Sequence, residues 1–142
     1  MKNIKQFSKR FGFYIAVVLI VVWFNLFVVR LAIVHGSSMY PTLENRNFAF
    51  IWQFNYTPQN GDIIVLFSDT VFGVNVVKRV IATGGQYINI NGNYIYIYEG
   101  YVFLIGDNQN ESRDSRHYGV ISEESIMGRV FLVLTPFPKF LR

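Results

Sequence analysis

The sequence predicts a mostly β, antiparallel fold behind one N-terminal apolar segment. After residue 30, short runs rich in Val, Ile, Tyr and Phe alternate with Gly, Pro, Asn and Asp, which is typical of strands joined by turns. Asn91-Gly92 lies between two such runs and favours the type I′ turn of a hairpin. No stretch after residue 30 has convincing helical periodicity. We therefore expect an antiparallel β-sandwich or a partly open barrel.

Eight strands are expected in this β-rich part, each bounded by turn-forming residues. The chain of 142 residues has room for one such domain, and its 51% of hydrophobic residues can form a core. The expected strands are residues 31–34, 48–54, 63–67, 74–82, 87–90, 94–98, 101–105 and 126–134.

The apolar segment at residues 11–29 has the length that crosses a bilayer core as a helix, and only Gly12 and Asn25 interrupt it. Four basic residues and no acidic residue precede it, so the positive-inside rule keeps the N-terminus in the cytoplasm. A cleaved signal peptide is the alternative, but its apolar region is shorter and ends in a small-x-small site. Here the run ends in Val28-Val29-Arg30, which favours an uncleaved anchor.

We therefore divide the chain into a cytoplasmic basic tail at residues 1–10, a transmembrane helix at 11–30 and an extracytoplasmic β-rich domain at 31–142. Five of the 13 basic residues precede Leu31, whereas all nine acidic residues follow it. The net charge of +4 thus reflects membrane topology rather than a phosphate-binding face, and we expect no nucleic-acid partner.

The composition also argues against metal and cofactor chemistry. There is no cysteine, so the chain has no disulfide, no thiolate nucleophile and no cysteine-based metal site. His35 and His117 are the only histidines, and they lack the spacing of a zinc site. We expect no metal and no cofactor.

Residues 36–43 form a hydroxyl-rich turn between the apolar segment and the β-rich part. Ser38 in this turn is the candidate nucleophile. A serine hydroxyl is a weak nucleophile unless a base within hydrogen-bond reach takes its proton. The remaining polar stretches are therefore candidates for supplying that base.

Lys78 and Arg79 interrupt the β-branched run at residues 76–81. Strand alternation places Lys78 on one face with Val76 and Val80, and Arg79 on the other. A lysine among valines loses its proton more readily, because desolvation disfavours the charged form. The alternative is an edge-strand lysine that points to solvent and guards against aggregation, and spacing alone favours this alternative.

A second polar stretch, residues 106–116, follows an apolar strand directly and is dense in Asp, Asn, Ser and Arg. Such a loop is either held by its own hydrogen bonds and ion pairs or simply solvated, and its composition does not decide between the two.

Together these stretches resemble the bacterial type I signal peptidases, which are membrane-anchored serine proteases with a Ser-Lys dyad. Four boxes of that family occur in the family's order, and the resemblance extends from the anchor to about Gly128. The boxes are Ser38-Met39-Tyr40-Pro41-Thr42, Gly61-Asp62-Ile63, Lys78-Arg79-Val80-Ile81, and Gly106-Asp107-Asn108 with Ser112-Arg113-Asp114-Ser115-Arg116. The short catalytic portion is similar to the minimal Gram-positive form.

The resemblance implies that Ser38 is the nucleophile, that Lys78 is the general base and that Ser112 orients the Lys78 amine. A base must be neutral, so the resemblance overturns the edge-strand interpretation of Lys78. It also implies a structural network behind the site, in which Asp114 and Arg116 form an ion pair. The supporting residues are Met39, Asp107, Asn108, Asp114 and Arg116.

The implied activity is removal of signal peptides from exported preproteins through an acyl-enzyme. The preprotein would bind as an extended strand, with small residues at the first and third positions before the cut. The implied partners are this peptide and the lipid bilayer, and we expect a monomer. The implied location is the bacterial cell membrane, with a single pass and the catalytic domain outside.

Two positions depart from the family pattern. Gly36 stands where Gram-negative members have a serine that donates to the oxyanion. The backbone N–H of Ser38 is the implied first donor, and the second donor is not assigned. Residues 82–86 also differ from the usual Gly-x-Pro-Gly-Asp, which concerns the local turn rather than the dyad.

Other functions remain open on the residues alone. A Ser-His-Asp hydrolase would combine Ser38 or Ser112 with His117 and with Asp107 or Asp114. An inactive membrane-anchored relative would bind exported proteins without cutting them, but it would lack the serine or the lysine. A soluble self-cleaving repressor would need a DNA-binding domain, for which the sequence has no candidate.

Phe48, Phe50, Trp52 and Phe54 alternate along one expected strand and therefore share a face. This face either rests in the membrane interface, which aromatic rings favour, or belongs to the core. The sequence does not identify the side chains that line the specificity pockets.

Overall fold

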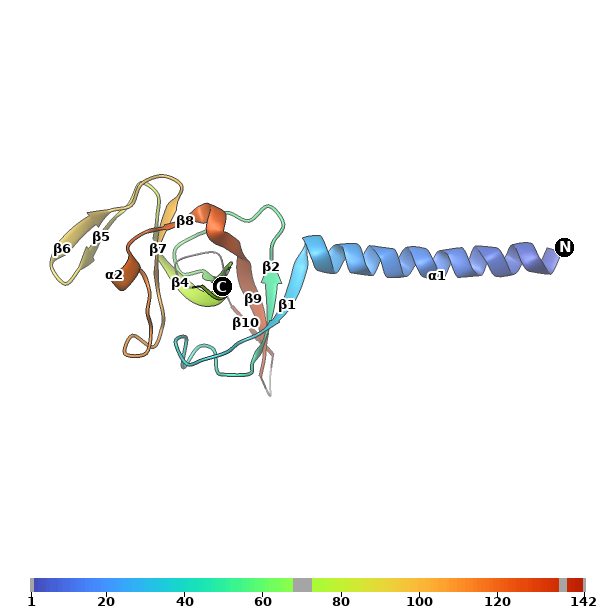
Figure 1. The fold of residues 1–142 in the computed structure, drawn as a ribbon, viewed down its shortest axis with the longest axis horizontal. Coiled ribbons are helices and arrows are strands. Elements are labelled where there is room, and N and C mark those ends of the chain that lie inside the picture. The colour runs from blue at the N-terminus through green and yellow to red at the C-terminus, as the bar shows by residue number, and fades with distance from the viewer. Residues whose placement is uncertain (1, 68–72, 136–137, 142) are drawn as a thin grey trace.

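The computed structural model describes residues 2–67, 73–135 and 138–141 of the chain (Figure 1). Most of these residues form an antiparallel β domain, from which helix α1 (Lys2–Phe27) projects. The predicted mostly β, antiparallel architecture is confirmed. The predicted division into three parts stays a prediction, because the fold alone does not say where the membrane lies.

Helix α1 ends at Phe27, three residues before the predicted end of the apolar helix at residue 30. Strand β1 (Val29–Ile33) begins almost immediately and includes Arg30, which lies opposite Ile51. The prediction was wrong here because the β-branched pair Val28-Val29 suits a strand as well as a helix. Within the described residues, no helix combines the length and apolar character that a membrane span requires.

The strands form one continuous eight-stranded sheet and a separate hairpin. All strand pairs are antiparallel. Along the sheet the order is β1, β2 (Phe48–Trp52), β9 (Ile126–Leu134), β3 (Ile63–Leu66), β4 (Val76–Thr83), β7 (Tyr101–Ile105) and β8 (Ile121–Ser122), and β10 (Pro138–Phe140) pairs with β9. The hairpin consists of β5 (Tyr87–Ile90) and β6 (Asn93–Tyr96).

All eight predicted strands exist, with ends displaced by a few residues. Asn91 and Gly92 have φ values of 53° and 90°, as the hairpin turn requires. The elements that the sequence did not predict are all very short, and so carry little periodic signal. They are β8, β10, α2 (Ser115–Tyr118) and the 3₁₀ turn at Glu123–Ser125.

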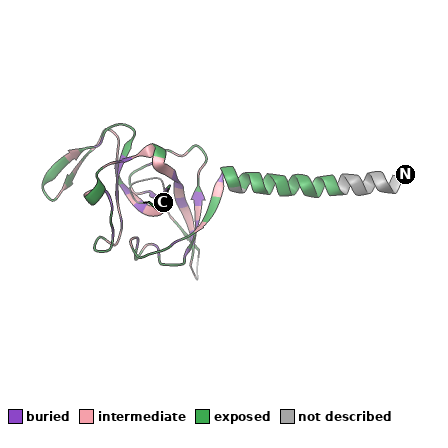
Figure 2. Ribbon diagram, viewed as in Figure 1, coloured by how far each residue is buried: buried purple, intermediate pink, exposed green. Residues whose placement is uncertain are grey.

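The core lies on both faces of the sheet, and all four residues of β3 are buried. Figure 2 shows that the buried residues gather in the sheet, whereas the described part of α1 is exposed. One cluster joins Met39 and Leu43 to Ile51 and Val65. A second cluster joins Ile64 and Leu66 to residues of β4, β7 and β8. The sheet is therefore covered on both sides at its centre.

Strand β4 lies at that centre, between β3 and β7. Lys78 on β4 is only 3% exposed. The edge-strand interpretation of this lysine is therefore wrong. Spacing along one strand could not reveal this, because a strand's neighbours are set by distant segments of the chain.

The aromatic face of β2 is largely uncovered by the described residues. Phe48, Trp52 and Phe54 are 44%, 38% and 59% exposed. The ring of Phe131 lies beside those of Phe50 and Trp52, with centroids 6.4 and 6.5 Å away. The core interpretation is thus wrong for the three exposed rings, and Ala49 and Ile51 between them face the core instead.

Candidate active site

The turn that carries Ser38 is held in place by the side chains that follow it. Met39 and Leu43 are buried in the core cluster next to β2 and β3. Backbone hydrogen bonds from Tyr40 N to Ser37 O (3.0 Å) and from Leu43 N to Met39 O (2.9 Å) close the turn. Met39 therefore supports the site by packing, and Ser38 remains half-buried at the surface of the domain.

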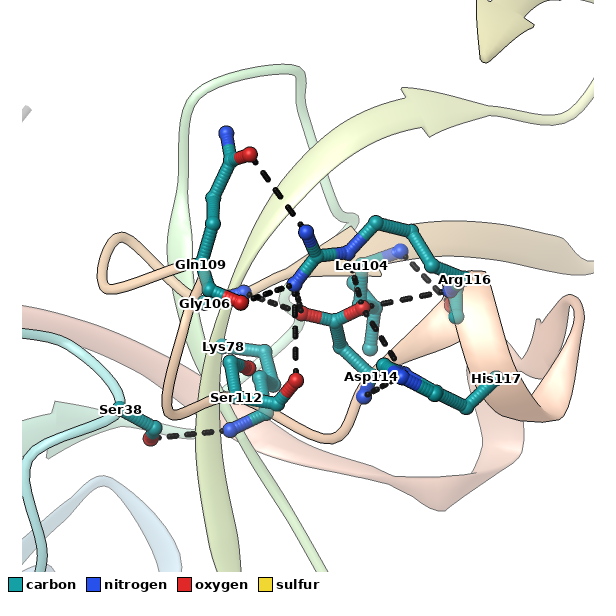
Figure 3. Close-up of polar contacts among 10 residues, drawn as sticks. Ser38, Lys78, Leu104, Gly106, Gln109, Ser112, Asp114, Arg116 and His117 are labelled. Carbon is teal, nitrogen blue, oxygen red and sulfur yellow. Dashed lines mark hydrogen bonds and ion pairs between the residues drawn. The ribbon is translucent and has the colours of Figure 1, made fainter. Parts of the chain in front are cut away.

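The structure brings Ser38 and Lys78 together. Lys78 Nζ lies 2.9 Å from Ser38 Oγ, within hydrogen-bond distance (Figure 3). The register partner of Lys78 on β3 is Ile64, which is fully buried. Burial lowers the pKa of the Lys78 amine, and the negative charge of Asp114 opposes this effect only in part.

The backbone of the loop at residues 106–116 contacts the turn at residues 36–43, which carries the candidate nucleophile and is called the nucleophile turn below. Asn108 N donates to Ser38 O at 2.9 Å. A Cβ atom on Gly106 would overlap Ser38 O and the side chain of Ser112, so only glycine allows this close approach. Asn108, which the sequence assigned to the supporting network, thus acts through its main chain.

Asp114 and Arg116 form the predicted ion pair (Figure 3). Arg116 Nε and Nη2 lie 2.8 and 2.9 Å from the two oxygens of the buried Asp114 carboxylate. The same carboxylate accepts from Gly106 N at 3.0 Å and caps helix α2. Burial would raise the pKa of Asp114, but hydrogen bonds from Arg116 and the Gly106 backbone outweigh it and lower the pKa to about 2.

Asp107 pairs with Arg79, a partner that the sequence did not suggest. Arg79 Nε and Nη2 each lie 2.7 Å from one carboxylate oxygen of Asp107, and Arg79 Nη1 donates to Gly61 O at 2.7 Å. Burial opposes ionisation of Asp107, but the hydrogen bonds from Arg79 and Thr42 prevail and lower its pKa. Arg79 points away from the lysine's face of β4, as strand alternation predicted.

Among the described residues, no hydrogen bond links Ser112 to Lys78. Ser112 Oγ is buried against Gly106, and near the Asp114 carboxyl it helps to lower the pKa of that group. The orienting role of Ser112 therefore stays a prediction. In the part of the chain that the structure describes, the hydroxyl hydrogen-bonded to Lys78 Nζ is that of Ser38.

Neither histidine contacts the serine within the described part of the chain. His117 lies on α2, where its Nδ1 is 3.5 Å from Asp114 N, and its side chain is mostly exposed. His35 Nδ1 lies 3.1 Å from Ile33 O at the end of β1. The arrangement gives no support to a Ser-His-Asp triad.

A groove of about 630 Å³ lies beside Ser38. Its walls come from β1, from the first half of β4 and from the core under the nucleophile turn, and they are mostly apolar. The lining includes Ala32, Val34, Met39, Val65, Val77 and Met127. Strand β1 is the last strand of the sheet on this side, so one of its backbone edges has no partner strand among the described residues.

Comparison with known protein families matches residues 5–99 and 97–135 to the family described as "Signal peptidase, peptidase S26". This chain belongs to that signal peptidase family. It is therefore a serine peptidase of the signal-peptidase type, and the resemblance to the bacterial type I enzymes is confirmed.

Relatives occur in bacteria and in mitochondria. The mouse protein "Mitochondrial inner membrane protease subunit 1" is 36% identical, covering 74% of this chain and 69% of its own length. "Signal peptidase I" of Bacillus caldolyticus is 27% identical and covers 98% of this chain and 97% of its own length. The crystal structure of a signal peptidase I from Enterococcus faecalis covers 53% of this chain at 24% identity, with a TM-score of 0.44.

The second box of this signal peptidase, at Gly61-Asp62-Ile63, supports the fold rather than the groove. The buried Asp62 carboxylate accepts from Tyr56 Oη at 2.6 Å and from Arg129 Nη1 at 3.2 Å. Burial, together with the hydrogen bond to Asp62, raises the pKa of Tyr56, so its hydroxyl keeps its proton and remains a donor. Sequence reasoning missed these partners because they are not adjacent to the box.

The contribution of Asp114 to the stability of the domain depends on pH in the acid range. Its pKa is about 2 in the folded state against an ordinary value of 3.8, so its stabilising effect is complete at higher pH and is lost as the pH falls from about 4 to about 2. Because one pKa unit corresponds to about 1.4 kcal/mol, we expect a loss of about 2 kcal/mol over this window. Thermal unfolding of the wild type and of Asp114→Asn across this range measures it.

The Asp114→Asn variant should be less stable at neutral pH and should lose less stability on acidification. Glu124→Gln removes an exposed carboxylate and serves as the control, which should follow the wild type. Equal pH slopes for the wild type and Asp114→Asn would show that the ion pair does not stabilise the fold.

Proposed function

We propose that this chain is a membrane-bound serine endopeptidase that removes N-terminal signal peptides from exported preproteins, with Ser38 as nucleophile and Lys78 as general base. The observation that carries the proposal is the 2.9 Å approach of Lys78 Nζ to Ser38 Oγ, at a site where burial lowers the pKa of the amine. A neutral amine has the lone pair that a general base needs.

In the first half of the reaction, Ser38 Oγ attacks the carbonyl carbon of the scissile peptide bond while Lys78 Nζ accepts the hydroxyl proton. The tetrahedral intermediate then collapses. Lys78 returns the proton to the leaving amine of the mature protein, and the signal peptide stays on Ser38 as an ester.

In the second half, Lys78 takes a proton from a water molecule, and the resulting hydroxide attacks the ester carbonyl. Collapse of the second tetrahedral intermediate returns the proton to Ser38 Oγ and releases the signal peptide. One base thus serves both halves, so the cycle ends with the neutral amine and the free hydroxyl with which it began.

The backbone N–H of Ser38 is suited to stabilise the oxyanion. Within the described residues it has no hydrogen-bond acceptor. By contrast, the N–H of Gly36, two residues earlier, donates to Asn45 Oδ1 at 3.2 Å. A free N–H at the attacking residue costs no rearrangement when negative charge develops on the substrate oxygen.

The groove suits an extended peptide with small apolar side chains. The free edge of β1 offers backbone donors and acceptors to an added strand, while pockets between alternate side chains select residues. Ser38 lies in the wall of the groove, so a peptide in this position passes the nucleophile. We expect small residues at the first and third positions before the cut, because apolar pockets of limited size would select them.

The support for membrane attachment is the apolar run at residues 11–29 of the sequence, together with the basic residues that precede it. We propose that α1 anchors the protein in the cell membrane of a bacterium, with the β domain outside and the protein acting as a monomer. The exposed rings of Phe48, Trp52 and Phe54 then rest in the membrane interface, where aromatic side chains are favoured.

Replacing either member of the dyad should abolish preprotein cleavage, because the nucleophile and its base act as a unit. We expect Ser38→Ala and Lys78→Ala each to reduce kcat/KM by about 10³-fold or more. The measurement is correctly placed cleavage of a preprotein by the purified protein in detergent. His117→Ala is the matched control and should cleave nearly as well as the wild type; full activity of Lys78→Ala would disprove the dyad.

The rate should also depend on pH through the lysine. Lys78 acts only when neutral, so kcat/KM should fall as the pH falls through its pKa, which burial holds below the ordinary value of 10.5. A pH profile of peptide cleavage measures this limb. The same limb should persist in His117→Ala, and its disappearance in that variant would assign the base to the histidine instead.

The aromatic face should matter for substrates in a membrane and not for soluble ones. We expect the double variant Trp52→Ser/Phe54→Ser to remain folded and to cleave a short soluble peptide normally, but to process a preprotein in lipid vesicles several-fold more slowly. Tyr87→Ser/Tyr94→Ser, on the exposed hairpin, is the control. Unfolding of the first double variant would contradict the proposed role of this face in the membrane interface.

A further inference from the structure

We propose that Glu111 is a positioning residue, which fixes the nucleophile turn through the hydroxyl of Ser37. This inference rests on the proposed role of Ser38. Ser37 Oγ donates a hydrogen bond to Glu111 Oε2, although the two residues are 74 positions apart in the sequence. Neither residue has a role assigned by the sequence boxes or by the dyad.

Two contacts from one short turn of the loop hold the chain on either side of the nucleophile. The Glu111 carboxylate accepts a hydrogen bond from Ser37 Oγ, and Asn108 N donates to Ser38 O at 2.9 Å. Glu111 N in turn donates to Asn108 O at 3.1 Å, so the two contact points belong to a single turn. The nucleophile is therefore tied to the loop both before and after its Cα atom.

The loop is itself fixed, which a tether requires. Arg116 Nη2 donates to Gln109 O at 3.0 Å, while the same guanidinium pairs with the buried carboxylate of Asp114. Glu111 thus lies on a segment that is joined to the interior of the domain. Contacts run from Asp114 through Arg116 and the loop to Ser37.

The chain before Ser38 needs such a tether. Strand β1 ends at Ile33, and Gly36 has a φ of 90°, a conformation that leaves the strand. A catalytic pair must be held within about 0.5 Å of its productive geometry. The Glu111 contact supplies this restraint directly next to the nucleophile, where the described residues provide no strand pairing.

The contact also has a consequence for the oxyanion. A serine hydroxyl has one proton to donate, and that of Ser37 is directed to Glu111. Ser37 therefore does not replace the serine donor that is missing at Gly36. Its hydroxyl instead holds the backbone next to the Ser38 N–H, which has no acceptor among the described residues.

Loss of the tether should change the rate of the chemical step rather than substrate binding. Neither Ser37 nor Glu111 lines the groove, whereas Ser38 does. A displacement of the nucleophile by about 1 Å can cost up to about 10²-fold in rate. We therefore expect kcat to fall about 10-fold while KM stays within about twofold.

A double-mutant cycle tests this proposal in the full-length protein in detergent. The variants are Glu111→Ala, Ser37→Ala and the two combined, with a preprotein-derived peptide as substrate. Each single change should lower kcat, and the double variant should be no worse than either. Glu111→Gln keeps an acceptor oxygen and should retain most activity, and the exposed Glu124→Ala is the control.

Thermal unfolding of the same variants separates positioning from stability, since a positioning role predicts unchanged midpoints. Additive losses, a rise in KM or a fully active Glu111→Ala would overturn the proposal. Acylation of Ser38 by a small tri-alanine nitrophenyl ester, followed by intact mass, is a second readout. A wild type that is acylated but cuts no preprotein contradicts the substrate assignment alone, whereas one that does neither contradicts the dyad and the role of Glu111 together.

Discussion

Burial of the Lys78 amine against Ser38 is the interaction on which the rest of the site depends. The amine lies on a central strand, 3% exposed, and its register partner on β3 is fully buried. Such a position disfavours the ammonium form, because the charge would lose its water. In the sheet, β4 has one strand on each side, and apolar clusters cover both faces. Together they bury the amine of Lys78.

The arrangement of the nearby charges limits the opposition to this lowered pKa. A free carboxylate close to the lysine would favour the ammonium, and Asp114 does act in this direction. However, Asp114 is matched by Arg116, and Asp107 by Arg79 on the opposite face of β4. The two arginines pair with the carboxylates of Asp107 and Asp114, so these acids help to build the structure of the loop.

The sequence identified Ser38 and Lys78 through their boxes, but it could not supply their surroundings. Residue spacing favoured an edge strand for Lys78, because alternation describes the two faces of a strand and not its neighbours. Strand positions were predictable, since each is a local pattern. The pairing of Asp107 with Arg79 and the contact of Glu111 with Ser37 join segments far apart in the chain, and no local pattern encodes them.

The connection from α1 to Ser38 links the proposed anchor with the proposed chemistry. The helix ends at Phe27, and the five residues of β1 span about 17 Å before the chain turns into the nucleophile segment. The same strand forms a wall of the groove, and its register partners on β2 include the exposed aromatic residues. With α1 as the anchor, one strand therefore sets the distance of Ser38 from the lipid, the edge that receives the peptide and the face that meets the membrane interface.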